Sequence, residues 1–346
     1  MSLELEIINP LDYKDWDERL CSKQDYSFFH SSSWAKVLCE SYNYKPLYFT
    51  LGNNRSFSVL VPIMEVNSFL TGRRGVSLPF SDYCELILDQ GFDVREVLKY
   101  IIDYGKKARW KYIELKPGKK MHEGVQPSER FYTHALPLVQ EEGRIFEKFR
   151  ESTRRNIKKA INEGVSVQRF NSLASVKEYY RLHCMTRKEH GLPPQPYHFF
   201  KKVYECIISR NLGFVALASY KNKIIAGAIY FHFGDKVIYK YGASDKEYQH
   251  LRANNLVMWE AIRLYCKAGF KNFCFGRTEF NNPGLRQFKN GWGTKEAIIR
   301  YYKYDLIRDA FITDINDMIA VYHRVFKKTP VSVLKIVGSL LYKHIG

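Results

Sequence analysis

Residues 214–243 read FVALASYKNKIIAGAIYFHFGDKVIYKYGA, and this stretch decides the fold class. It contains three runs rich in β-branched and aromatic residues, which is the composition of β-strands. The runs are 214–220, 224–233 and 237–243. Gly234-Asp235 joins the last two runs and is a strong hairpin signal. The stretch therefore predicts an antiparallel meander of three strands.

A helix and a further strand are expected after the meander. Leu256, Trp259 and Ile262 lie on one face of a helix over 256–267, and residues 273–275 predict a strand. One more strand is expected at 297–304. A meander that leads through a helix into another strand is typical of a mixed α/β sheet.

The first half of the chain repeats this order. Helices are expected at 34–42 and 94–107, strands at 45–51, 56–66 and 110–115, and further β-rich sequence at 75–88. The segment 107–111 (KARWK) matches 267–271 (KAGFK) at an offset of 267 − 107 = 160 residues, and both segments join a helix to a strand. We therefore predict two copies of one α/β unit, at 1–140 and 144–307, followed by a helical tail at 308–346.

Three helices and a short strand are expected before the meander of the second copy. Residues 145–162 predict one continuous and very basic helix that ends at Gly164. A short strand at 165–170 and helices at 172–190 and 196–209 follow.

The composition is strongly basic. Lys plus Arg number 54 and Asp plus Glu number 36, so the net charge is 54 − 36 = +18. Such a charge favours an anionic partner: a nucleotide, a phosphorylated carrier, a nucleic acid or an acidic membrane surface. A generally basic, solvated surface is the alternative.

The cysteines and the hydropathy pattern predict a cytoplasmic protein. None of the seven Cys lies in a Cys-x-x-Cys pair, so neither a zinc site nor a disulfide framework is indicated. The spacing of His183, His190 and His198 does not indicate a metal either, and we predict none. No signal peptide is expected, and no apolar run reaches the ~20 residues of a membrane span.

Four short motifs together resemble one known family. They are STRRNIKKA at 152–160, HGLPP at 190–194, KYGASD at 240–245 and FGRTE at 275–279, with FKNGWG following at 288–293. As a set in this order they resemble the FemAB-like proteins, relatives of the enzymes that build peptidoglycan interpeptide bridges. The resemblance is densest over 145–304.

The resemblance implies two tandem GNAT-like domains and transfer of an acyl or aminoacyl group to an amine. The donor it implies is an aminoacyl-tRNA or an acyl-CoA, without a metal, and the acceptor a phosphorylated, lipid-linked or nucleotide-linked cell-envelope precursor. The chain lacks the long helical arm of some bridge-forming members. It also lacks the glycine-rich pyrophosphate loop of CoA-using members, since residues 250–255 read HLRANN.

Two groups of residues are candidates for binding phosphate. Arg154, Arg155, Lys158 and Lys159 pair at i, i+4 spacing along one flank of the basic helix. Arg252, Asn254 and Asn255 precede a helix that follows a strand, and the resemblance assigns the pyrophosphate of the donor to this place. The alternatives are a solvated basic face for the first group and simple N-capping by an asparagine for the second.

The candidates for catalysis and substrate contact lie around the last two strands. Glu279 follows a strand and is a candidate base, and Tyr241 is a candidate proton donor or wall of the acyl pocket. Alternation along the strand predicts that Tyr239 and Tyr241 face the same side. Arg277, Lys289 and Trp292 are candidates for substrate binding; an Arg277–Glu279 surface pair and a core position for Trp292 or the tyrosines are the alternatives.

Other functions remain open from the sequence. The charge and the aromatic content of 15% also permit a nucleic-acid-binding protein or a noncatalytic adaptor. In the tail, Val331, Leu334, Val337, Leu341 and Ile345 form one apolar stripe. This stripe predicts an amphipathic helix that docks on the protein itself or lies on an anionic membrane surface.

Overall fold

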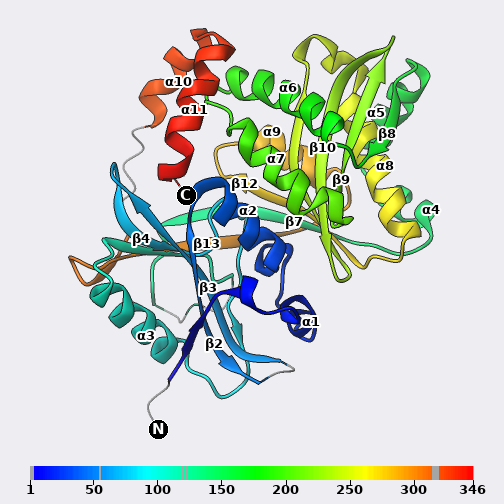
Figure 1. Ribbon diagram of the computed structural model, residues 1–346. Coiled ribbons are helices and arrows are strands. Elements are labelled where there is room, and N and C mark those ends of the chain that lie inside the picture. The colour runs from blue at the N-terminus through cyan, green and yellow to red at the C-terminus, as the bar shows by residue number, and fades with distance from the viewer. Residues whose placement is uncertain (1–3, 54–55, 119–120, 122–123, 314–318, 346) are drawn as a thin grey trace. The chain divides into compact units, whose positions relative to one another are not determined.

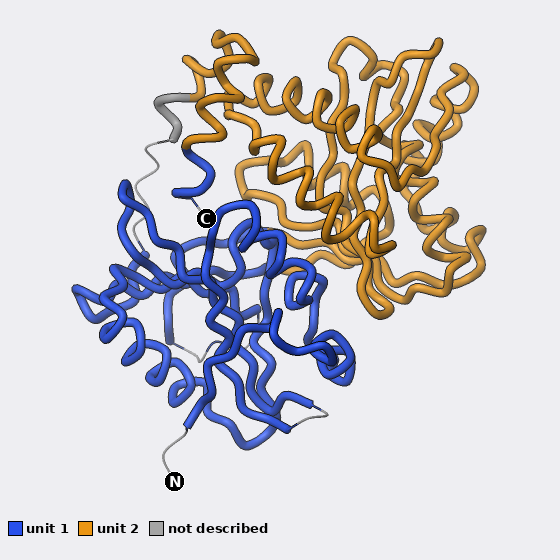
Figure 2. The backbone as a smooth tube through the Cα atoms, in the orientation of Figure 1, with its two compact units in different colours: residues 1–131, 298–316, 341–346 blue, residues 132–297, 317–340 orange. Residues whose placement is uncertain are grey.

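The computed structural model describes residues 4–53, 56–118, 121, 124–313 and 319–345. The chain divides into two compact units (Figures 1 and 2). Unit 1 comprises residues 1–131, 298–316 and 341–346, and unit 2 comprises 132–297 and 317–340.

Unit 1 is a mixed sheet with helices packed against it. Its helices are α1 (Trp16–Cys21), α2 (Ser32–Tyr42) and α3 (Val94–Lys107). Its strands are β1 (Glu6–Ile8), β2 (Lys45–Gly52), β3 (Phe57–Ser68), β4 (Gly72–Val76), β5 (Ile87–Leu88), β6 (Tyr112–Leu115), β14 (Ala310–Ile312) and the later part of β13 (Lys295–Asp305). Strands β1 to β4 pair antiparallel in chain order, and β6 pairs parallel to β4 and antiparallel to β13.

The core of unit 1 explains why α3 forms where it does. Val97, Leu98 and Ile101 recur on one face of α3 and pack with the inward side chains of β3 and β6, including Val61 and Ile113. Asp93 caps the helix by accepting a hydrogen bond from the Arg95 N–H at 2.8 Å. The predicted helix 94–107 and the predicted strands at 45–51 and 56–66 are confirmed.

Unit 2 has a second mixed sheet. Its strands are β8 (Ser166–Phe170), β9 (Gly213–Tyr220), β10 (Lys223–Phe233), β11 (Lys236–Ser244), β12 (Asn272–Glu279) and the greater part of β7 (Glu129–Pro137). Its helices are α4 (Glu142–Glu147), α5 (Glu151–Asn162), α6 (Leu173–Glu189), α7 (Tyr197–Cys206), α8 (Ala253–Lys267), α9 (Pro283–Asn290), α10 (Ile319–Lys328) and most of α11 (Val331–Ile345). The strand order is β7-β12-β11-β10-β9-β8, and the predicted meander is confirmed as β9-β10-β11.

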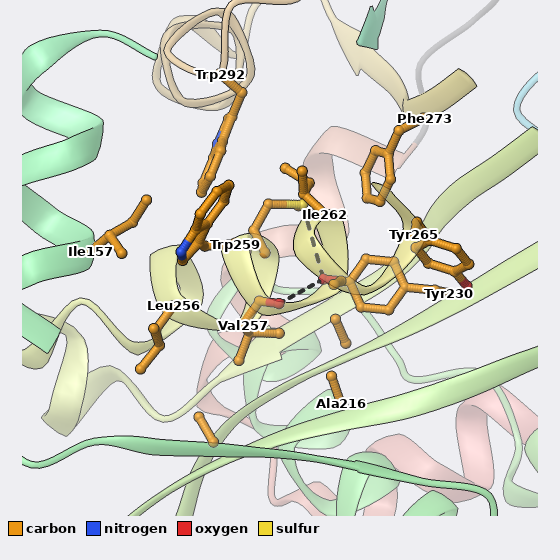
Figure 3. Close-up of a cluster of buried hydrophobic side chains, with 14 of the residues drawn as sticks. Ile157, Ala216, Tyr230, Leu256, Val257, Trp259, Ile262, Tyr265, Phe273 and Trp292 are labelled. Carbon is orange, nitrogen blue, oxygen red and sulfur yellow. Dashed lines mark hydrogen bonds between the residues drawn. The ribbon is translucent and has the colours of Figure 1, made fainter. Parts of the chain in front are cut away.

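Helices cover both faces of the sheet of unit 2. Tyr230 of β10 contacts α8, where its hydroxyl donates to the Val257 carbonyl at 3.4 Å. Figure 3 shows this cluster, with Trp259 between Trp292 and Ile157 of α5. The next residue, Phe231, points the other way, toward Tyr241 and the face that carries α6 and α7.

The basic helix expected over 145–162 is two helices. Arg150 is extended, with φ −53° and ψ 143°, and its N–H donates to the Gly291 carbonyl at 2.9 Å. The tertiary hydrogen bond therefore ends α4 and starts α5 after an interruption, although the sequence across 148–150 has no Pro or Gly.

The bounds of the units differ from the expected domains in two places. Residues 298–316 belong to unit 1, because Tyr302 to Asp305 of β13 pair with β6. The tail is divided between the units rather than separate from both. Its helix α11 buries Leu334 completely, and the Tyr44 hydroxyl donates to the Tyr342 and Lys343 carbonyls at 3.2 and 3.1 Å, so the tail docks on the protein.

Within the described part of the chain, none of the helices has the length and apolar character required to cross a bilayer.

Candidate functional site

Two parallel strands of unit 2 separate as they run toward their carboxyl ends. Strands β11 and β12 pair only at Lys236–Asn272, Val237–Phe273 and Ile238–Cys274, although they continue to Ser244 and Glu279. A wedge therefore opens between the later halves of β11 and β12. Carboxyl ends of parallel strands that part in this way are a common place for ligands in α/β folds.

A β-bulge in β11 lies where the wedge begins. The register between β10 and β11 shifts so that Ile229 is opposite Tyr241 while Tyr230 is opposite Tyr239, which leaves Lys240 as the extra residue. A bulge of this kind bends the strand and increases its twist. It thereby turns the end of β11 away from β12.

The bulge places Tyr239 and Tyr241 on opposite faces of the sheet, so the expectation that both face one side is wrong. The Tyr239 ring packs 5.6 Å from the ring of Tyr230 on the α8 face. The Tyr241 ring instead lies 5.4 Å from the ring of Phe200 on the α6–α7 face. One inserted residue reverses the alternation that the period of two would give.

The side of the wedge that faces α6 and α7 is lined with packed aromatic rings. The ring centroids of Tyr241 and His183 are 6.3 Å apart, and those of His183 and Phe200 are 4.9 Å apart. Burial, aided by the charge of Arg187, lowers the pKa of His183 to about 3, so its imidazole is neutral at pH 7. Among the described residues His183 Nε2 has no hydrogen-bond partner.

Helix α8 begins beside the end of β11 without a side-chain cap. Its N-cap residue is Arg252, whose side chain makes no capping hydrogen bond and whose backbone is left-handed at φ 60° and ψ 28°. Asn254 instead donates from Nδ2 to Ser244 Oγ at 3.1 Å, which ties the helix start to β11, and Asn255 is buried. Neither Asn254 nor Asn255 therefore acts as the N-cap of α8, which was the alternative interpretation of these residues. The Asn255 N–H already donates to the Arg252 carbonyl at 2.9 Å. The other first-turn N–H groups of α8 are the ones that an anion next to the exposed Arg252 would meet.

The other wall of the wedge is the end of β12. Arg277 is half-buried, Glu279 is exposed, and Thr278 between them is buried with no hydrogen-bond partner for Oγ1 among the described residues. Asn282 caps α9 by accepting from the Leu285 N–H at 3.1 Å. Helix α9 thus follows directly from the wall of the wedge.

Lys289 and Trp292 lie inside the protein. Lys289 is 2% exposed, and its Nζ donates to the carbonyls of Gly276 and Arg277 at 3.1 and 2.8 Å. These hydrogen bonds hold α9 against β12 rather than reaching a solvent-accessible phosphate. Trp292 is fully buried, with its ring 4.9 Å from that of Phe149, and is a core residue.

The four cations of the basic helix lie on the outer face of α5. Thr153, Ile157 and Ala160 are buried, while Arg155, Lys158 and Lys159 are exposed and Arg154 is half-buried. Arg155 forms an exposed ion pair with Glu151, at 3.6 Å. Ile157 packs toward the first turns of α8 (Figure 3), so α5 flanks the helix whose start borders the wedge.

Asn254 at the start of α8, beside Arg252, is hydrogen-bonded to Ser244 at the end of β11, and Tyr241 lies three residues earlier on β11. Arg277 and Glu279 lie on the neighbouring strand β12. Sequence reasoning missed Ser244 and His183 as parts of this region, whereas Thr278 lies inside the FGRTE motif. Ser244 lies inside the KYGASD motif, which was the available signal. His183 carries no sequence signal for this site, because only its burial against the aromatic rings distinguishes it.

A family model for the acetyltransferase (GNAT) domain matches residues 147–290, the stretch that contains the wedge. The matched stretch lies within unit 2. The chain is also 36% identical over 86 residues to a Lipid II:glycine glycyltransferase from Staphylococcus haemolyticus (strain JCSC1435), a match that covers 22% of this chain and 20% of that protein. The chain therefore aligns with about a fifth of the length of this curated relative.

Solved structures extend the likeness of the GNAT fold to nearly the whole chain. The structure of FemX matches with a TM-score of 0.65 at 14% identity, over 94% of this chain and 100% of that one. A tandem GNAT protein from the clavulanic acid biosynthesis pathway matches with a TM-score of 0.55 at 7% identity, over 88% and 98%. Together with the family model, these matches confirm the expected fold class and the resemblance to the FemAB-like proteins.

Proposed function

We propose that the chain is an N-acyltransferase that moves an acyl or aminoacyl group from an anionic carrier to the amine of a phosphorylated acceptor. The observation that carries the proposal is the uncapped start of α8 beside the wedge between β11 and β12. An anionic carrier fits the helix start, and its extended arm fits a gap between two separating strands.

The carrier is acyl-CoA or aminoacyl-tRNA. In acyl-CoA the pantetheine arm joins the pyrophosphate to the thioester, and in aminoacyl-tRNA the terminal nucleotide joins its phosphate to the aminoacyl ester. Arg252 and the first-turn amides of α8 other than that of Asn255 would bind phosphate of the carrier, and Asn254 would keep the helix start in place through Ser244. A charged hydrogen bond of this kind contributes about 1.5–3 kcal/mol. No metal is part of the proposal.

In the proposed reaction the nitrogen of the acceptor amine forms a bond with the acyl carbon. The carbon–sulfur bond of a thioester, or the carbon–oxygen bond of an aminoacyl ester, breaks, and the thiol or hydroxyl leaves with a proton. Glu279 at the end of β12 is the group assigned to take the proton of the amine. Tyr241 on β11 would form the wall against which the acyl group lies.

The acidity of the acceptor sets how much catalysis is required. An α-amine with a pKa near 7.8 loses its proton at pH 7 for about 1 kcal/mol, whereas a lysine side chain requires about 4.6 kcal/mol. Because positioning alone contributes about 7–11 kcal/mol, an exposed carboxylate such as Glu279 suffices for an α-amine acceptor.

The name of the curated relative, Lipid II:glycine glycyltransferase, supports a lipid-linked acceptor of the cell-envelope type. The phosphate of such an acceptor would meet the cations of α5, Arg154, Arg155, Lys158 and Lys159. A lipid-linked acceptor also places the enzyme at the inner face of a membrane, with the tail as one surface that would face it.

The test is a transfer assay with the full chain and two donor classes, acetyl-CoA and glycyl-tRNA. The acceptor is a nucleotide-linked or lipid-linked muropeptide, and the product is measured by mass spectrometry. We expect transfer from one donor class. Arg252→Ala should raise the KM for that donor about tenfold or more, in line with the loss of one charged hydrogen bond.

Lys267→Ala is the matched control, because Lys267 is an exposed cation at the opposite end of the same helix. It should leave the KM for the donor unchanged. Absence of transfer from both donors, with no carrier retained in native mass spectrometry, would overturn the proposal. Binding of tRNA that leads to no transfer would favour a nucleic-acid-binding adaptor instead.

A further inference from the structure

The hairpin between β3 and β4 in unit 1 ends in two large apolar side chains that face solvent. Phe69 is 82% exposed and Leu70 is 56% exposed. The strands pair up to the turn, with Ser68 opposite Gly72 and Asn67 opposite Arg73. Single exposed apolar residues are ordinary, but two adjacent ones at the tip of a hairpin present a continuous apolar projection.

The hairpin tip is a fixed structure. Ser68 Oγ accepts from the Leu70 and Thr71 N–H groups at 3.2 and 3.0 Å. The buried Arg74 donates to the His344 carbonyl at 2.7 Å, and the Thr71 hydroxyl donates to the same carbonyl at 3.1 Å. The last turn of α11 is therefore joined to the base of the hairpin, since its free carbonyls find donors there.

The residue that follows this attachment in the chain is a third exposed apolar one. Ile345, which is 55% exposed, follows His344, and the His344 ring lies 4.5 Å from the ring of Phe69. We name Phe69, Leu70 and Ile345 the apolar tip. All three belong to unit 1.

Cations surround the apolar tip. Lys343 and Arg73 are exposed, and the exposed Lys111 lies across Gly72, with its Cε 2.5 Å from where a Gly72 Cβ would be. The nearby carboxylate, Glu65, is 14% exposed and is 4.0 Å from Arg73 Nε. The surface is thus apolar at its centre and basic at its edge.

We propose that the apolar tip enters the interfacial layer of an anionic lipid surface. Projecting Phe and Leu side chains with neighbouring Lys and Arg are the combination that binds peripherally, because the apolar groups leave water while the cations stay among acidic headgroups. A protein partner would more often meet a flat or hollow patch in which charge is depleted at the centre. The surface is independent of the proposed transfer reaction, although a lipid-linked acceptor would be reached more easily from it.

The experiment is flotation of the full chain with vesicles of phosphatidylcholine alone or with 30 mol% phosphatidylglycerol. We expect flotation with the anionic vesicles and little with the neutral ones. The double variant Phe69→Ser/Leu70→Ser should reduce anionic flotation about tenfold or more, and Lys343→Glu should reduce it to a smaller extent. Ile307→Ser, at an exposed apolar residue of unit 1 that is 79% exposed, is the matched control and should float like the wild type.

An independent measurement uses Phe69→Trp, whose emission should shift to the blue when anionic vesicles are added. Melting temperatures of the serine variants should equal that of the wild type, because the replaced side chains are exposed. Equal flotation of the double variant and the wild type, or the absence of flotation with anionic vesicles, would overturn the proposal. The proposal would also be overturned if the wild type self-associates, the double variant does not, and neither protein binds vesicles.

Discussion

Arg252 has a backbone conformation that its side chain disfavours. A non-glycine residue at φ 60° carries a penalty of about 1–2 kcal/mol. Glycine would remove the penalty, yet arginine stands at this point, between the short 3₁₀ helix at Lys246–Leu251 and α8. A strained backbone at Arg252, beside the uncapped start of α8, is expected if the arginine side chain contributes to ligand binding.

Arg252→Gly should therefore separate stability from binding. Its free energy of unfolding should exceed that of Arg252→Ala by about 1 kcal/mol, because glycine adopts the left-handed conformation without a steric penalty. Both variants should show the same weakened affinity for the donor, because both lack the guanidinium. Urea denaturation measures the first quantity, and donor titration measures the second.

The outcome that would contradict this reasoning is an alanine variant more stable than the glycine variant. The residue would then be right-handed, and the helix start would differ from the one described. Equal donor affinity in the wild type and Arg252→Gly would exclude the guanidinium from the phosphate site, whatever the stabilities.

Residue identity predicted the location of the candidate site better than the orientation of its side chains. Arg252, Asn254 and Glu279 are recognisable because they are polar residues at the ends of a strand or helix. Lys289 has the same chemical character, but the carbonyls of Gly276 and Arg277 satisfy its ammonium in the interior. Whether a lysine meets solvent or a carbonyl depends on tertiary packing that a linear pattern does not contain.

At the scale of elements, the sequence predicts what depends on periodicity and fails where a tertiary contact interrupts it. Helix α3 and the strands β9, β10 and β11 follow from their apolar spacing. The bulge at Lys240 and the extended Arg150 have no local cause, because neither Pro nor Gly stands at either position. The extended Arg150 arises from its hydrogen bond to the distant Gly291, whereas the bulge at Lys240 arises within the register of the β10–β11 hairpin and reverses the side-chain alternation there.

The tail helix α11 carries a testable prediction at this scale. Leu334 is fully buried, whereas Leu340 on the same helix is 59% exposed. Leu334→Ala should lower the free energy of unfolding by about 2–5 kcal/mol, since it leaves a cavity, and Leu340→Ala should change it by at most about 0.5 kcal/mol. Chemical denaturation of the two variants beside the wild type measures both effects.

Equal effects of the two substitutions would contradict the docking of α11 on the protein. A large effect of Leu340→Ala alone would mean that the opposite face of the helix is the buried one. The aromatic contact of Tyr342 with Phe80, 5.8 Å between ring centroids, gives a further position at which docking is testable.

At the scale of the whole molecule, the two units have one order of elements. In unit 1 the β2-β3-β4 meander leads through α3 to β6, which pairs parallel to β4. In unit 2 the β9-β10-β11 meander leads through α8 to β12, which pairs parallel to β11. The segments KARWK and KAGFK join the equivalent helix and strand. Duplication of one unit remains the prediction, to be checked by superposing the two.

The two units also contain histidines that burial keeps neutral. Burial lowers the pKa of each below its ordinary value, and in His183 it lowers the pKa to about 3. The others are His134, His190, His232 and His344. In the unfolded chain these imidazoles take up protons near pH 6.5, so the unfolded state binds more protons than the folded state below that pH. Their contribution to stability is present above pH 6.5 and is lost as the pH falls toward their folded pKa values.

We therefore predict that the free energy of unfolding falls between pH 7 and pH 5, with His183 alone accounting for about 2 kcal/mol. The carboxylates with lowered pKa, such as Glu296 at about 2 beside Arg286, lose their contribution only below about pH 4.5, so this window belongs to the histidines. His183→Phe keeps an aromatic ring against Phe200 and should flatten the dependence by about that 2 kcal/mol, whereas His250→Gln, at an exposed histidine, should keep the wild-type slope. Urea denaturation of the three proteins at pH 5, 6 and 7 measures how steeply the free energy of unfolding of each one depends on pH.

A His183→Phe slope equal to that of the wild type would show that His183 takes up its proton in the folded chain, which requires an opening of the α6–α7 face beside Tyr241. Because that face borders the wedge, the same result would assign acid-induced opening to the wall of the proposed acyl pocket.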